Sequence, residues 1–123
     1  MQQGATAAFD IAALKHAMEH SDAEALLGLY ADEAEMEIVD RSRPPSSPMR
    51  LIGKPAIEAF WREVCGRAMT HAVSDAVAGA DRAAFIERCT YPDGCQVVAS
   101  MNLELRGGRI VRHLTVQAWD ETG

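Results

Sequence analysis

The sequence is poor in cysteine, and the few cysteines that it has do not form a recognisable module. Cys65, Cys89 and Cys95 are an odd number without C-x-x-C spacing, so the pattern indicates neither a disulfide framework nor a zinc-binding motif. Unpaired cysteines suit a reducing compartment, and we expect a cytoplasmic protein. Cys89 and Cys95 flank an expected turn, where they either interact or remain separate thiols.

Positive charge and long apolar segments are also scarce. Twelve Lys and Arg residues against 18 Asp and Glu residues give a formal net charge of -6 at pH 7, the opposite of the basic surface that binds nucleic acid. No apolar run approaches the roughly 20 residues of a membrane-spanning helix, and the first residues lack the basic start of a secretory signal. We therefore expect neither nucleic acid nor a membrane as a partner.

The remaining composition is that of an ordinary globular domain. Hydrophobic residues make up 48% of the 123 residues and charged residues 24%, values that favour a packed core over disorder. A chain of this length can bury a core without disulfides or metals. We expect one domain spanning residues 1–123.

The C-terminal half is patterned as strands. Residues 96–106 and 109–119 read as two strands joined by two glycines, which supply the positive φ of a tight hairpin turn. Residues 71–78 and 82–91 precede them and extend the pattern to a four-stranded antiparallel meander. In the strand over residues 96–106 the apolar side chains alternate, so one face carries Val97, Ala99, Met101, Leu103 and Leu105.

The N-terminal half is patterned as helices. Residues 7–20 place apolar side chains on one stripe, and Ser21 and Glu24 have the spacing of a capping box, which predicts a second helix ending near residue 31. A third helix opens at Gly53-Lys54-Pro55, where proline suits the first turn. Its apolar face is expected to carry Ile57, Phe60, Trp61, Val64 and Cys65.

Two segments connect the second and third helices. A short strand of about six residues passes through Met36 and Ile38, and residues 41–48 contain three prolines that exclude a helix or ladder. This loop is either a plain connection or a lid. Helices placed before a sheet favour an α+β domain with an antiparallel sheet.

This order of elements resembles the nuclear-transport-factor-2-like superfamily, which includes ketosteroid isomerases, polyketide cyclases and SnoaL-like domains. The resemblance rests on residues 21–34 (SDAEALLGLYADEA), residues 53–57 (GKPAI) and residues 107–111 (GGRIV). It implies a cone-shaped domain, also described as cystatin-like, in which a curved antiparallel sheet wraps around three N-terminal helices. It further implies an apolar cavity and a homodimer formed through the outer face of the sheet.

The resemblance does not extend to the isomerase site. Ketosteroid isomerases use a carboxylate base on the first strand and an oxyanion hole made by a tyrosine and a protonated aspartate. The corresponding positions here are Ile38, Leu14 and Met101. Apolar side chains can neither accept a proton nor donate to an enolate, so we do not expect that chemistry.

A cavity between the helices and the sheet is the expected ligand site. An apolar wall with a few polar groups is typical of small-molecule sites, although core packing explains the same residues equally well. The expected lining residues are Leu14, Met18, Tyr30, Met36, Ile38, Phe60, Trp61, Met101, His113, Thr115, Gln117 and Trp119.

Three hypotheses for function remain open. The first is binding of a small hydrophobic molecule. The second is a cofactor-independent cyclase, dehydratase or isomerase in which His113, Asp40 or His71 is the acid or base. The third is an assembly domain with a filled interior. No pair of histidines has metal-ligand spacing, so we expect neither a metal nor a cofactor.

Overall fold

The computed structural model describes residues 8–121, which form three helices and six strands. The expected α+β class is confirmed. In chain order the elements are α1 (Ile11–Glu19), α2 (Ala23–Leu27), β1 (Tyr30–Val39), β2 (Met49–Ile52), α3 (Lys54–Cys65), β3 (Thr70–Ala78), β4 (Arg82–Thr90), β5 (Gln96–Arg106) and β6 (Arg109–Trp119).

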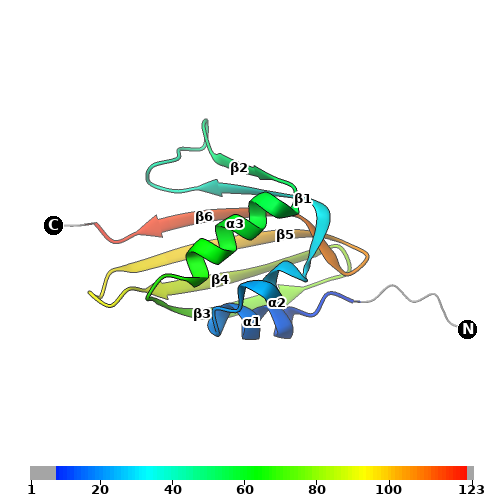
Figure 1. Cartoon of the computed structure of the whole chain (residues 1–123), viewed down its shortest axis with the longest axis horizontal. Coiled ribbons are helices and arrows are strands. Elements are labelled where there is room, and N and C mark those ends of the chain that lie inside the picture. The colour runs from blue at the N-terminus through cyan, green and yellow to red at the C-terminus, as the bar shows by residue number, and fades with distance from the viewer. Residues whose placement is uncertain (1–7, 122–123) are drawn as a thin grey trace, which may run out of the picture.

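All six strands belong to one sheet with the order β2-β1-β6-β5-β4-β3 (Figure 1). The expected meander of β3 to β6 is confirmed, and each neighbouring pair within it is antiparallel. The expectation of a wholly antiparallel sheet is wrong, because β1 runs parallel to β6. A parallel pair needs a long crossover, and the chain between these two strands includes α3 and four further strands.

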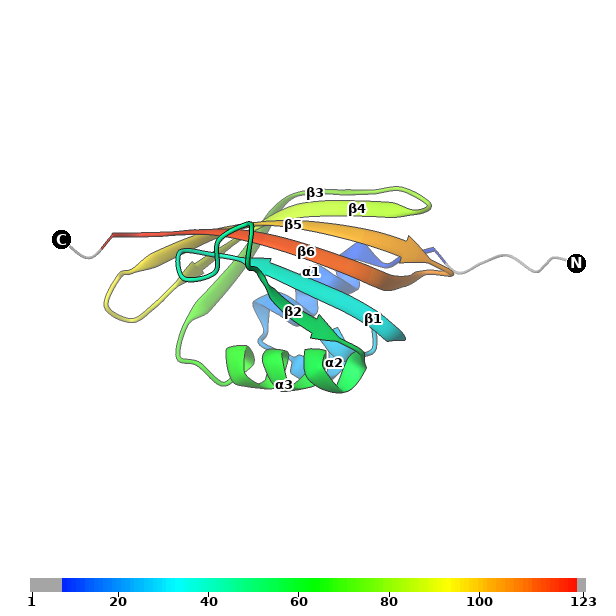
Figure 2. The same cartoon turned by 90° about the horizontal axis from the view of Figure 1, so that it is seen from above.

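The three helices lie on one face of the curved sheet (Figure 2). Helix α1 packs against β3, α3 packs against β1 and β2, and α2 contacts both of the other helices. This leaves the opposite face of the sheet uncovered by any element of residues 8–121. No helix in this part of the chain is long and apolar enough to cross a membrane.

The hairpin of β5 and β6 has the bounds that the sequence predicts. Gly107 and Gly108 have φ angles of 60° and 77°, which glycine adopts without steric cost. The face of β5 predicted to be apolar is buried from Val97 to Leu105, and on β6 His113 and Thr115 are buried on the same side. Alternation therefore identified the inner face of the sheet correctly.

The predicted start and end of the second helix are wrong. Asp22, not Ser21, is the N-cap, since its carboxylate accepts a hydrogen bond of 3.1 Å from the backbone N–H of Ala25. Ser21 has a φ of 52° and links the two helices. Helix α2 ends at Leu27, so Tyr30 begins β1, which is ten residues long instead of about six.

The start of the first helix and the segment after β1 also differ from the sequence prediction. Helix α1 begins at Ile11 because the carboxylate of Asp10 caps it, accepting from the N–H of Ala13 at 3.0 Å; residue 7, the predicted start, lies outside the described residues. Strand β2 was not predicted. It directly follows the proline-containing turn and pairs with β1, with Met36 opposite Leu51.

Candidate functional site

A pocket of about 210 Å³ opens between the C-terminal half of α3 and the ends of four strands. Strands β1, β5 and β6 form its floor together with the last residues of β4, and the turn after β1 forms part of its mouth. We call it the α3 pocket. Seven of the twelve expected lining residues are among those that line it, namely Ile38, Phe60, Trp61, Met101, Thr115, Gln117 and Trp119.

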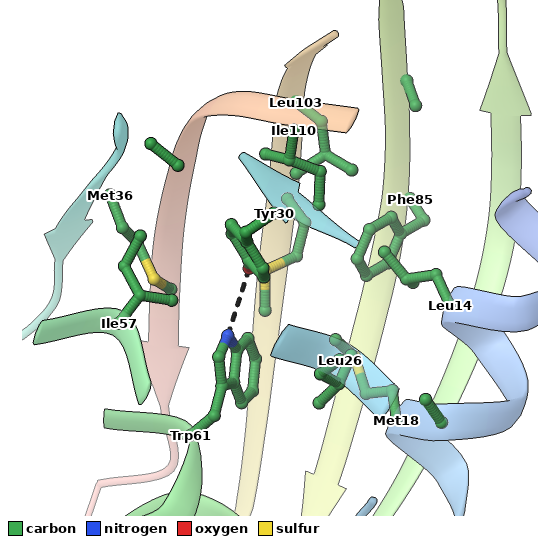
Figure 3. Packing of buried hydrophobic residues seen from close by; sticks show 14 of the residues in the cluster. Leu14, Met18, Leu26, Tyr30, Met36, Ile57, Trp61, Phe85, Leu103 and Ile110 are labelled. Carbon is green, nitrogen blue, oxygen red and sulfur yellow. Dashed lines mark hydrogen bonds between the residues drawn. The ribbon is translucent and has the colours of Figure 1, made fainter. Parts of the chain in front are cut away.

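The other five expected residues do not line the α3 pocket. All five are buried, at 1–2% exposure: Leu14, Met18, Tyr30, Met36 and His113. Figure 3 shows Leu14 beside Phe85, Met18 beside Leu26 and Met36 beside Ile57, so these apolar side chains are packed against other core residues. The interior is therefore divided into a packed half and an open half.

A buried chain of hydrogen bonds separates the two halves. The indole N–H of Trp61 donates to the hydroxyl of Tyr30 at 3.1 Å (Figure 3), and this hydroxyl lies 2.7 Å from Nδ1 of His113. Nε2 of His113 lies 2.9 Å from the sulfur of Met101. Because the Tyr30 hydroxyl accepts from Trp61, its own proton is donated to Nδ1 of His113. The imidazole therefore carries its proton on Nε2, which faces the sulfur of Met101.

The environment of His113 does not support the hypothesis that it is a general base. Burial lowers the pKa of His113 to about 3, so its ring is neutral at pH 7. Both ring nitrogens are already paired with side chains. Burial likewise raises the pKa of Tyr30 well above its usual range. His113 therefore holds α3 to the sheet through Tyr30.

Asp40 lines the mouth of the α3 pocket, but its carboxylate is also paired. It accepts from Nη1 of Arg43 at 3.0 Å and from the backbone N–H of Ser42 at 2.9 Å. Asp40 and Arg43 also form an isolated bridge across the turn. Asp40 therefore fixes the turn that borders the pocket, while the ring nitrogens of His113 pair with Tyr30 and Met101 instead.

His71 lies in a second buried polar group, which we call the His71 cluster and which also contains Glu87 and Cys89. His71 pairs directly with Cys89 across β3 and β4, and Glu87 is on the same face of β4 two residues earlier. Nδ1 of His71 lies 2.7 Å from Oε2 of Glu87 and 3.4 Å from the sulfur of Cys89. The side chains of His71 and Glu87 are only 2% and 5% exposed.

The His71 cluster adjoins the α3 pocket. Glu87 and Cys89 both line it, whereas His71 does not. Burial, together with the neighbouring Glu87, raises the pKa of the Cys89 thiol far above its usual range, so this sulfur is a poor nucleophile. Of the three residues in the cluster, Glu87 is therefore the one that both lines the pocket and offers a carboxylate to a bound molecule.

The donors of the His71 cluster are of the types that zinc accepts. One atom from each of its three residues lies within 4.8 Å of the others. However, two ligands on one zinc ion stand about 3.3 Å apart, given metal–ligand bonds of roughly 2.0–2.1 Å, and Nδ1 and Oε2 are closer, at 2.7 Å. The side chains would have to separate to hold a metal; as placed, they form a hydrogen-bonded pair suited to proton transfer.

Sequence reasoning missed Glu87, although a signal for it existed. In β4 the inward positions are Ala83, Phe85, Glu87 and Cys89, so a carboxylate falls on an otherwise apolar face. An ionisable residue at an inward position of an alternating strand is unusual, and it marks a candidate functional group. Arg41, Arg43 and Arg67 were also missed as pocket residues, because none of them lies on an apolar face.

A curved sheet covered on one face by three helices, with a pocket open at the strand ends, defines a nuclear-transport-factor-2-like protein. Within this class the chain belongs to the family described as SnoaL-like domain, which matches residues 11–113. No curated protein matches the chain significantly.

Solved structures show the same fold. An NTF2-like protein of unknown function from Mesorhizobium loti has a TM-score of 0.77 at 21% identity, over 88% of this chain and 87% of its own. A candidate ketosteroid isomerase from Kribbella flavida DSM 17836 has a TM-score of 0.73 at 19% identity, over 92% and 76%. A loop-truncation variant of IdmH has a TM-score of 0.65 at 26% identity, over 87% and 88%.

Proposed function

We propose that the α3 pocket binds a small, mostly apolar molecule. The observation that carries the proposal is an open pocket of about 210 Å³ whose inner wall includes Phe60, Trp61 and Met101. This volume exceeds the roughly 150 Å³ of an apolar cavity that holds benzene, so a molecule of one or two rings is the right size. Aromatic and thioether side chains adapt to such rings.

Polar groups on the pocket wall favour a ligand that has a polar atom as well. The hydroxyl of Thr115 is fully buried and has no hydrogen-bond partner among residues 8–121, and Thr115 lines the pocket. A buried hydroxyl without a partner costs about 1–3 kcal/mol. A ligand oxygen or nitrogen beside Thr115 would recover part of this free energy.

Binding can be tested with 1-aminonaphthalene, a neutral two-ring probe whose fluorescence depends on its environment. We expect saturable binding to the wild-type protein and its loss in Val97→Phe, because Val97 lines the pocket and is 4% exposed. Val98→Phe is the matched control, since Val98 faces outward on the same strand. Absence of saturable binding, or equal binding by both variants, would contradict the proposal.

A second candidate function is a cofactor-free acid–base enzyme, and the contact of Glu87 with His71 favours it. Glu87 lines the pocket, and His71 Nδ1, 2.7 Å from its carboxylate, can orient it and share its proton. Glu87 would remove a proton from the carbon next to a carbonyl, the electron pair moving to the oxygen as an enolate, and the proton would then return. This role falls to Glu87 in place of His113, with His71 as a positioning residue.

Deuterium exchange tests this step without knowledge of the natural substrate. 1-Indanone, a two-ring ketone, is incubated with the protein in deuterated buffer, and the loss of its α-hydrogen signal is followed by NMR. We expect faster exchange with the wild-type protein than in buffer and no acceleration with Glu87→Gln. Exchange at the buffer rate, or equal acceleration by both proteins, would argue against Glu87 as a base.

We further propose a homodimer located in the cytoplasm. Leu114 and Val116 are 37% and 44% exposed on the outer face of the sheet, an apolar surface that a second copy would cover. All three cysteines are free thiols, as a reducing compartment would keep them.

A further inference from the structure

Three arginines border the α3 pocket of a protein whose net charge is negative. Arg41, Arg43 and Arg67 all line it, although Lys and Arg together number 12 against 18 Asp and Glu. Two of these charges are compensated, since Arg43 pairs with Asp40 and Arg67 pairs with Glu63. Arg41 has no ion-pair partner among residues 8–121.

Arg41 is held in place by an aromatic side chain. Its guanidinium carbon lies 4.5 Å from the centre of the Trp119 ring, a stacking contact that leaves the N–H groups at its edge free to bind. Trp119 in turn stacks on Tyr91, with ring centres 5.9 Å apart. The hydroxyl of Tyr91 accepts a hydrogen bond of 3.1 Å from Arg67. We call these four residues the Arg41 rim.

The Arg41 rim and the pocket wall differ in the chemistry they offer. The rim presents a guanidinium fork, which matches the two oxygens of a carboxylate or sulfonate. The pocket beneath it presents Phe60, Trp61 and Met101. Two carboxylates also line the pocket. Asp40 at the mouth is paired with Arg43, whereas Glu87 faces His71 in the interior and would repel an anion placed deep in the pocket.

From this arrangement we infer that the ligand of the α3 pocket is an amphipathic monoanion, a flat apolar body with one carboxylate or sulfonate that Arg41 binds at the mouth. This inference rests on the proposed binding function and adds the class and the orientation of the ligand. The apolar rings enter first and lie against Trp61, and the anionic group stays at the Arg41 rim, where water still reaches it. The charge therefore need not be fully desolvated, which keeps its binding favourable.

A pair of probes that differ in one group tests the inference. 5-Aminonaphthalene-1-sulfonate carries the anion, and 1-aminonaphthalene is the same ring system without it. We expect Arg41→Gln to weaken binding of the sulfonate about fivefold, the effect of losing one partly exposed charge pair, and to leave binding of the neutral probe unchanged. Salt should weaken sulfonate binding to the wild-type protein more than to Arg41→Gln.

The control is Arg88→Gln, which removes the same charge from the outer face of β4; we expect it to affect neither probe. If neither probe binds, or if Val97→Phe weakens neither, the proposed pocket function fails. If the neutral probe binds in the pocket but Arg41→Gln changes both probes equally or neither of them, the pocket stands and the anion inference is overturned. Equal losses in Arg41→Gln and Arg88→Gln would also overturn it, because only overall charge would then matter.

Discussion

The hydroxyl of Tyr30 lies 2.7 Å from Nδ1 of His113, and through it β1 connects α3 to β6, the neighbouring strand of the sheet. Tyr30→Phe removes this hydroxyl while keeping the ring. Trp61 and His113 then each lose a buried hydrogen bond, so we expect a loss of about 1–3 kcal/mol in the free energy of unfolding. Urea denaturation measures it. Tyr91→Phe is the control, because that hydroxyl contacts an exposed arginine and should matter little.

His113 should make stability depend on pH below neutrality. Its pKa in the folded protein is lowered by burial from 6.5 to about 3, so the unfolded chain binds a proton at this site more readily. The stability linked to neutral His113 is complete above pH 6.5 and is lost as the pH falls toward 3, by at most about 1.4 kcal/mol per pH unit.

The measurement compares urea denaturation of the wild-type protein and His113→Gln at several pH values. The carboxylates are the same in both proteins, so the difference between the two curves isolates His113. We expect the advantage of the wild-type protein to shrink as the pH falls below 6.5. A constant difference between pH 7 and pH 4 would show that His113 titrates normally.

The buried contact between His71 and Glu87 should show strong coupling. Removing one partner leaves a buried polar or charged group unpaired, so His71→Leu and Glu87→Leu should each cost about 3–5 kcal/mol. The double variant replaces both by apolar groups and should cost much less than the sum of the two. Denaturant unfolding of all four proteins gives the coupling energy. Additive losses would mean that the 2.7 Å contact contributes nothing.

The assignment of the α2 cap can be tested at two neighbouring positions. Asp22→Ala should destabilise the protein by about 0.5–2 kcal/mol, since its carboxylate caps the helix. Ser21→Gly should stabilise it slightly, because Ser21 has a φ of 52°, which glycine adopts more easily. Thermal unfolding would distinguish this from the capping box predicted from the sequence, in which the change at Ser21 would be the damaging one.

Sequence alternation predicted the inner face of the sheet but not the depth of each residue along it. Ile38 and Tyr30 are both inward residues of β1, yet Ile38 is near the open end and lines the pocket, whereas Tyr30 is at the packed end. The period of a strand is two everywhere along it. Which end remains open depends on where the helices lie, and three-dimensional packing decides this.

The partners of the polar residues could not be predicted for a similar reason. His113 binds Tyr30, 83 positions away, and a local pattern contains no signal for such a contact. Arg67 pairs with Glu63 at the i,i+4 spacing that favours ion pairs on a helix, yet the same side chain also reaches Tyr91 at the pocket mouth. Local spacing indicates the ion pair, whereas the contact with Tyr91 depends on how α3 packs against the strand ends.

The outer face of the sheet provides a test of the proposed homodimer. Val116 is 44% exposed there and lies opposite Ser100 of β5, near the centre of the sheet. A lysine at this position would bury a charge in a dimer interface, so Val116→Lys should shift the protein toward the monomer mass of 13.4 kDa, as measured by gel filtration with light scattering.

Val77→Lys is the matched control. Val77 is 64% exposed near the tip of the β3–β4 hairpin, so this change should leave the mass unaltered. A wild-type protein that already runs at the monomer mass at micromolar concentration would refute the dimer, and the exposed Leu114 and Val116 would then be ordinary surface residues.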